Sequence, residues 1–143
     1  MPHLKIDYSA NLDAHTDMGQ LCRALAATLA GLRDARGEPL FPLAGSRVLA
    51  CPAPHHAVAG GRDGYGFVYL NCRITPGRER ALVDAAGDAL LATVKAHFAP
   101  LLAERPLGIT LHIDELAPAY EGKFSNLAAQ LARGPFPASN APA

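Results

Sequence analysis

The chain has 143 residues and a formal net charge of zero, with 13 basic and 13 acidic side chains. This length is typical of one domain with a core of its own. The zero charge argues against a general nucleic-acid-binding protein, which would carry a basic excess. Charged residues make up 18% of the chain, below the roughly 25% of a typical soluble domain, and this favours an oligomer whose interface covers part of the surface.

Composition also bears on the location of the protein and on metals. No apolar run reaches the ~20 residues that span a bilayer, and the N-terminus lacks the apolar segment of a signal peptide. The three cysteines, Cys22, Cys51 and Cys72, form no CxxC motif and predict neither a disulfide framework nor a zinc site. We therefore expect a cytoplasmic protein without membrane contact, whose cysteines act as small buried hydrophobic residues.

The first half of the chain predicts a strand, a helix and a second strand. Residues 3–8 alternate, with Leu4, Ile6 and Tyr8 on one side, which is typical of a half-buried strand. From Asp17, a candidate N-cap, apolar residues recur at helical spacing, and this helix should end near residues 33–37. A short strand is expected at residues 46–51, and the proline- and glycine-rich residues 52–66 should form a loop.

The second half repeats this order. Residues 67–74 predict an apolar strand, and a helix with one apolar stripe should begin at about Glu79 and stop before Pro106. Residues 107–115 alternate most regularly and predict the last strand. Residues 134–143 show no periodicity, so we expect a flexible C-terminal tail.

These elements predict one domain over residues 1–133, built from two βαβ units at about 2–51 and 67–115. Right-handed crossovers would give an α/β (α+β) fold: a four-stranded mixed sheet with both helices on one face. Its bare face would be buried by subunit association. The halves also resemble each other in sequence, which places Val68 at the position of Pro2, Thr110 at that of Arg47 and Leu12 at that of Arg78.

Common catalytic motifs are absent from the sequence. The glycine-rich residues 60–66 open a strand rather than a helix, so they match neither a P-loop nor a dinucleotide fingerprint. The six histidines show no metal-binding spacing, and we expect neither a metal nor an organic cofactor. Pro2 remains: removal of Met1 would leave a secondary amine at the start of a strand. Apolar surroundings or nearby cations would lower the pKa of this amine and make it a base near neutral pH.

Several motifs together carry a resemblance to a known family. They are Met1-Pro2-His3 before a strand, the Phe-Pro-Leu-Ala-Gly-Ser-Arg block at 41–47, Phe67-Val68, Ile74 with Gly77-Arg78, and Ala85-Ala86-Gly87. Over residues 2–131 the chain resembles the 5-carboxymethyl-2-hydroxymuconate isomerase family of the tautomerase superfamily. The resemblance implies a homotrimer that isomerises an unsaturated 2-hydroxy or 2-keto polycarboxylate from aromatic-compound catabolism. Pro2 would be the general base, and Arg47 and Arg78 would bind the substrate, Arg78 from the same or a neighbouring subunit.

Other interpretations remain open. The chain could be a tautomerase relative with a different substrate, including a hydrolytic dehalogenase, or a non-catalytic trimer that binds small acids. His3, Lys5 and His112 are interpreted as solvated strand residues in any of these cases. Residues 34–39 look like an insertion on the approach to Arg47, where they could alter the fit of the substrate.

Overall fold

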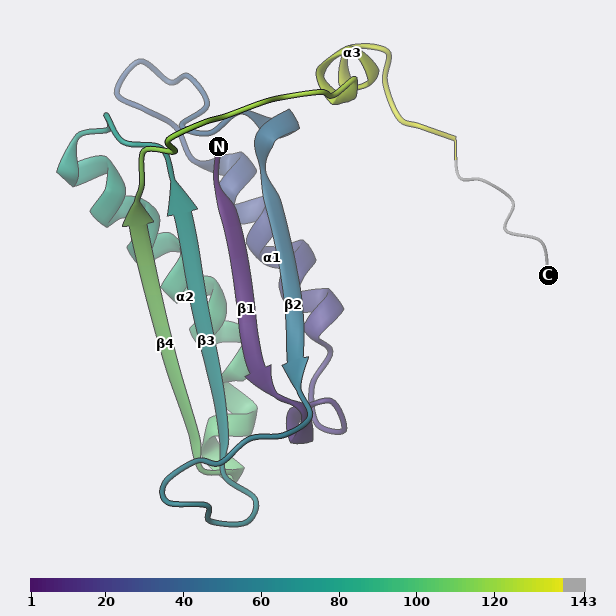
Figure 1. The fold of residues 1–143 in the computed structure, drawn as a ribbon, viewed down its shortest axis with the longest axis vertical. Helices are drawn as coiled ribbons and strands as arrows, with labels where there is room; N and C mark the ends of the chain where they lie inside the picture. Colours follow the sequence, from purple (N-terminus) through teal and green to yellow (C-terminus); the bar gives the residue numbers. More distant parts are fainter. Residues whose placement is uncertain (138–143) are drawn as a thin grey trace.

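The computed structural model describes residues 1–137 and contains one four-stranded sheet. The strands are β1 (His3–Ser9), β2 (Arg47–Ala53), β3 (Gly66–Ile74) and β4 (Leu107–Glu115), in the spatial order β2-β1-β3-β4. β1 is parallel to β2 and antiparallel to β3, and β3 is parallel to β4. Helices α1 (Met18–Gly31) and α2 (Arg80–Glu104) lie on the same face of this sheet (Figure 1). The predicted fold class, a mixed sheet with both helices on one face, is confirmed.

The core lies between the sheet and the two helices. Alternate residues of β1 and β3 point into it, and α1 and α2 contribute one apolar stripe each; the fully buried members include Leu4, Ile6, Leu21, Leu25, Leu70, Leu90 and Phe98. Asp17 caps α1, because its side chain accepts a hydrogen bond from the Gln20 amide at 2.9 Å. The central strands β1 and β3 are therefore fixed from both sides by neighbouring strands and from behind by the helices.

The strand registers agree with the internal repeat. If Pro2 is equivalent to Val68, then Leu4 is equivalent to Leu70 and Ile6 to Cys72. The sheet agrees with this, since Leu4 lies opposite Cys72 and Ile6 lies opposite Leu70. The helices follow the same relation, since the hydroxyls of Thr28 and Thr93 lie 2.7 Å apart where α1 and α2 meet. A pseudo-twofold axis thus relates the two halves.

The open face of the sheet is polar. Tyr69 contacts the ring nitrogen of His112 at 3.0 Å, and Asn71 donates to Asp114 at 2.6 Å. Lys5 pairs with a carboxylate of the same strand, Asp7, at 3.0 Å. Polar pairs of this kind can remain satisfied in water. A partner that covers this face must therefore meet hydrogen-bonding groups as well as apolar side chains such as Leu49, which lies exposed beside Lys5.

Three elements differ from the sequence-based expectations. Helix α1 ends at Gly31, because Leu32 turns to an extended conformation and accepts a backbone hydrogen bond from Leu40 at 2.9 Å. β2 includes Pro52, which an edge strand tolerates because one side of it needs no ladder hydrogen bonds. A short helix, α3 (Leu127–Ala132), contacts the 3-10 turn η2 (Leu43–Gly45) and was not expected.

Two further expectations concern the C-terminal tail and membrane contact. The predicted flexible tail spans residues 134–143, of which 138–143 lie outside the described residues. Among residues 1–137, no helix combines the length and the apolar character needed to cross a membrane.

Candidate active site

The N-terminus lies at the end of the sheet where β1 and β2 begin and β3 ends (Figure 1). Pro2 is fully buried, and its carbonyl accepts a hydrogen bond from the Arg47 amide at 3.0 Å. Because β1 is a central strand, its first residues are fixed by β2 on one side and β3 on the other. The position of Pro2 is therefore set by the sheet rather than by a mobile terminus.

Met1 shows what surrounds the ring nitrogen of Pro2. Its ammonium lies 3.5 Å from the hydroxyl oxygen of Thr75, to which it donates. Its side chain packs on Gly45, where an added Cβ would lie 2.5 Å from the Met1 sulfur. Burial lowers the pKa of the Met1 amine below its ordinary value, and the positive charges of Arg78 and then Lys123 lower it further. The first atoms of the chain thus occupy a desolvated and electropositive place.

Arg47 lies at the start of β2, and its side chain is exposed. Its Nη1 donates to the carbonyls of Ala44 at 2.8 Å and Ser46 at 3.0 Å. Within residues 1–137 no hydrogen bond engages its Nε or Nη2. The guanidinium is thus anchored by one nitrogen beside the turn that precedes β2, and the others are free to bind an anion.

Arg78 joins two loops that flank Pro2. Its Nε and Nη2 donate to the Leu40 carbonyl, each at 3.3 Å, and its Nη1 donates to the Thr75 carbonyl at 3.0 Å. The guanidinium also stacks on the ring of Phe41, 4.6 Å from its centroid. Each Nη nitrogen retains a second hydrogen for a ligand.

Residues 34–39 lie beside Arg78 rather than Arg47. Asp34 lines the same shallow hollow as Arg78, and its carboxylate accepts from the backbone amides of Arg36 and Glu38 at 2.8 and 3.0 Å. The segment is therefore a self-contained turn, and any influence on a ligand would act through Arg78.

A hollow of about 200 Å³ adjoins Met1, and sequence reasoning missed two of the side chains that line it, His3 and Arg73. Its outer wall is the segment that follows β4, including Leu116 and Glu121, which crosses over the N-terminus in Figure 1. Arg73 faces the open side of the sheet directly opposite His3. The alternation of β3 could have placed Arg73 on this face, but the sequence alone does not show which strand lies next to β1.

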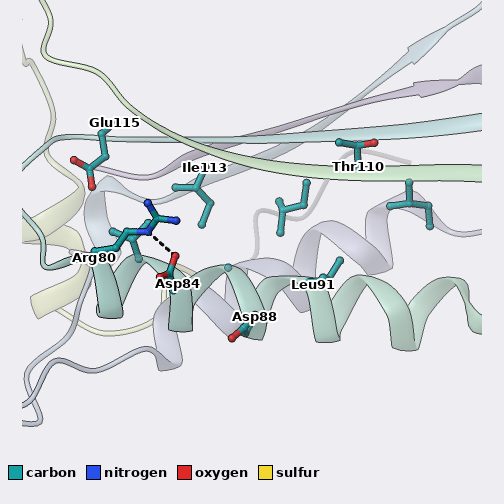
Figure 2. A pocket seen from close by; sticks show the side chains of 11 residues that line it. Arg80, Asp84, Asp88, Leu91, Thr110, Ile113 and Glu115 are labelled. Atoms are coloured by element: carbon teal, nitrogen blue, oxygen red, sulfur yellow. Dashed lines mark hydrogen bonds and ion pairs between the residues drawn. The ribbon is translucent and has the colours of Figure 1, made fainter.

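A larger hollow, of about 800 Å³, lies between α2 and β4 (Figure 2). Its floor is apolar, and its rim carries the carboxylates of Asp84, Asp88 and Glu115. The one cation there, Arg80, is already bound to Asp84 at 2.7 Å. This surface would repel a polycarboxylate, so the N-terminal end of β1 is the better site for one. Among residues 1–137, no group of three or more His, Cys, Asp or Glu side chains could hold a metal ion.

Comparisons with known proteins identify the family of this chain. The profile of the family described as 5-carboxymethyl-2-hydroxymuconate isomerase matches residues 2–131. The 5-carboxymethyl-2-hydroxymuconate Delta-isomerase of Escherichia coli is 33% identical over 127 residues, which cover 89% of this chain and 96% of that protein.

Solved structures show the same relationship. A 5-carboxymethyl-2-hydroxymuconate delta-isomerase is 45% identical with a TM-score of 0.85, over 92% of this chain and 93% of that one. An isomerase of this kind from Deinococcus radiodurans R1 is 31% identical with a TM-score of 0.79, over 91% and 93% of the two chains. A fused 4-OT, solved as a symmetric trimer, shares the fold at 18% identity and a TM-score of 0.53, over 90% and 98%. As its sequence motifs predict, the chain belongs to the 5-carboxymethyl-2-hydroxymuconate isomerase family.

Proposed function

We propose that this protein moves a proton along an unsaturated 2-hydroxy or 2-keto polycarboxylate of the 5-carboxymethyl-2-hydroxymuconate type, without a cofactor. The feature that carries this proposal is the place of the first amine of the chain, that of Met1, whose pKa is lowered by partial burial and by the positive charge of Arg78. Pro2, freed by removal of Met1, is the general base. A place in aromatic-compound catabolism and a cytoplasmic location remain predictions.

The environment of Met1 supports a basic role for Pro2. An α-amino group ordinarily titrates near pH ~8, and burial and cations both disfavour its protonated form. Pro2 is more deeply buried than Met1, and Arg78 is the leading charge that lowers the pKa of the amine at this place. The same influences would lower the pKa of the Pro2 amine once Met1 is removed, and a lower pKa favours the neutral state that a general base requires.

Arg47 and Arg78 suit the binding of two carboxylates. Both have guanidinium hydrogens left over after their contacts with backbone carbonyls, and guanidinium binds carboxylate in a planar, charge-assisted geometry. The two residues relate to the N-terminus differently. The Arg47 amide donates to the Pro2 carbonyl, whereas Arg78 donates to the carbonyl of Thr75, whose hydroxyl accepts from the Met1 ammonium. A substrate anchored by both would lie across the ring nitrogen.

The chemistry follows from this arrangement. Neutral Pro2 accepts a proton from one end of the conjugated system, and the arginines stabilise the negative charge that spreads along the dienolate. The prolinium then returns the proton to a distal carbon, which yields the isomerised unsaturated ketone. Proton count and charge are unchanged over the cycle, so the reaction needs no further reactant.

Activity measured together with N-terminal mass tests this proposal. The protein should lack Met1 and should isomerise 5-carboxymethyl-2-hydroxymuconate, and Pro2→Ala, whose primary amine has different basicity and geometry, should lower kcat. Rates on mono-, di- and tricarboxylates separate this reaction from that of a tautomerase relative with another substrate. A processed protein that isomerises none of them would instead be a non-catalytic binder of small acids.

We also propose that the chain assembles as a homotrimer. The segment after β4 passes the N-terminus and extends beyond β2 (Figure 1), and it bears the exposed apolar side chains Tyr120, Phe124, Leu127, Leu131 and Phe136. The apolar groove between α2 and β4 lies at the opposite edge of the sheet. An extension at one edge and a groove at the other favour a head-to-tail contact that closes into a ring. Light scattering after gel filtration should give three times the chain mass, and a monomer would contradict the assembly.

A further inference from the structure

Basic side chains form a row across the open face where β1 and β2 begin. Arg47 lies opposite His3, and His3 lies opposite Arg73 on the next strand. All three side chains are exposed. Two guanidinium groups thus lie on either side of one imidazole, all three open to solvent.

Within residues 1–137, the nearby acidic groups form no ion pair with Arg73. Asp114 is its neighbour on β4, but the Asp114 carboxylate accepts from Asn71 at 2.6 Å. Asp7 pairs with Lys5 at 3.0 Å, and Glu121 pairs with Lys123 at 3.2 Å. Among residues 1–137, Arg73 has neither an ion pair nor a side-chain hydrogen bond. Its full set of donors is therefore available to a ligand.

Arg73 also lies on the correct side of the reacting amine. Arg73, His3 and Met1 line one hollow of about 200 Å³, whereas the side chains of Arg47 and Arg78 lie outside its lining. An anion held by Arg73 would therefore belong to a different part of the ligand from the anions held by the other two arginines. The carboxylate in the outer wall, that of Glu121, is neutralised by Lys123.

We propose that Arg73, with the imidazole of His3 beside it, binds a third carboxylate of the substrate and so selects tricarboxylates over dicarboxylates. This inference rests on the proposed function, in which Arg47 and Arg78 bind the other two. The carboxymethyl group supplies the third carboxylate, since a 2-hydroxymuconate without that group carries only two. His3, interpreted from sequence as a solvated strand residue, thereby becomes part of the specificity site.

The test compares the kcat/KM of each variant for 5-carboxymethyl-2-hydroxymuconate and for 2-hydroxymuconate. Arg73→Gln should lower the ratio of these two values by about 10- to 100-fold, since a hydrogen bond to a charged group is worth about 1.5–3 kcal/mol. The loss should appear as a higher KM for the tricarboxylate, whereas its kcat and the kcat/KM for the dicarboxylate should change little. Arg73→Lys should restore part of the ratio, and His3→Ala should lower it by a smaller factor.

Arg62→Gln is the matched control, because Arg62 is an exposed arginine in the loop before β3, at the other end of the sheet. It should leave the ratio unchanged. If Arg73→Gln lowers kcat/KM equally for both substrates, or for neither, the proposal of a third subsite is wrong while the proposed function stands. A wild-type protein that turns over neither substrate overturns the proposed function itself. Thermal unfolding of each variant separates loss of binding from loss of folding.

Discussion

Substitution of Gly45 tests whether the substrate occupies the space that Met1 fills, once Met1 has been removed. A Cβ at Gly45 would lie 2.5, 2.9 and 3.3 Å from the sulfur, Cγ and Cβ of Met1, and no other heavy atom ranks among its three nearest neighbours. The φ angle of Gly45 is not positive. Gly45→Ala is therefore compatible with the backbone, and its methyl group projects into the space that Met1 fills.

The expected effects on stability and activity have opposite signs. In the processed protein the three nearest neighbours of the new methyl group, all atoms of Met1, are gone. The free energy of unfolding should then stay equal or rise by about 0.4–1 kcal/mol through the less flexible unfolded chain. A substrate that replaces Met1 beside Pro2 would meet the same methyl group and be displaced. A misplacement of about 1 Å can lower turnover by about 100-fold, so kcat/KM should fall by one to two orders of magnitude.

Steady-state kinetics and urea unfolding of Gly45→Ala measure both effects. Gly31→Ala is the control, since no atom lies within 4 Å of a Cβ built at Gly31, which ends α1 far from Pro2 along the chain. It should match Gly45→Ala in stability and wild type in activity. Undiminished kcat/KM in Gly45→Ala would refute the idea that substrate and Met1 share one place.

Three further predictions concern the arginines, a tyrosine and the core. Arg47→Ala and Arg78→Ala should each weaken carboxylate binding by about 1.5–3 kcal/mol. Only Arg78→Ala should also lower the free energy of unfolding, by about 1–3 kcal/mol, because Arg78 alone links separate loops. Equal free energies of unfolding in urea for the two variants would contradict this. Burial, and then the bond to Asp13, raise the pKa of Tyr8 to about 12. In the unfolded chain the pKa of tyrosine is ~10, so the contribution of Tyr8 to the free energy of unfolding should be intact below pH ~10 and be lost towards pH ~12. Tyr8→Phe should remove this pH-dependent loss. Identical alkaline unfolding profiles of wild type and Tyr8→Phe would count against it. Phe98→Ala, at a side chain with 0% exposure, should cost about 3–5 kcal/mol in the same unfolding assay, and a cost below about 1 kcal/mol would show that the core repacks there.

Much of the fold is local in origin and could be predicted from the sequence. The alternation of residues 107–115 gives β4 its bounds, and Asp17 marks the start of α1 through its own hydrogen bond. The repeat between the halves fixes which residues are equivalent, and the observed registers follow it. These features depend on neighbours in the chain, so periodicity and capping residues predict them directly.

Other features depend on tertiary contacts that the sequence does not display. Helix α3 has no buried residue, and its two leucines, Leu127 and Leu131, remain exposed. It forms beside η2, a contact across most of the chain length.

The site was only partly predictable for the same reason. Pro2, Arg47 and Arg78 were identified by resemblance to a family, and their roles remain proposals supported by the surroundings of the N-terminus. Arg73 belongs to no motif that the resemblance uses. Its relation to His3 arises from the antiparallel pairing of β1 with β3, and that pairing appears only once the order of the strands is known.

The account depends most on the protonation state of the Pro2 amine, which can be measured directly. Protein labelled with 15N-proline and lacking Met1 should be titrated by NMR, with an unstructured peptide of the same N-terminal sequence as reference. We expect the pKa of the Pro2 nitrogen to lie clearly below that of the peptide, and to rise in Arg78→Ala as one of the charges that lowers it is lost. A pKa equal to or above that of the peptide would contradict the account, since Pro2 would then be protonated and unable to act as a base at neutral pH.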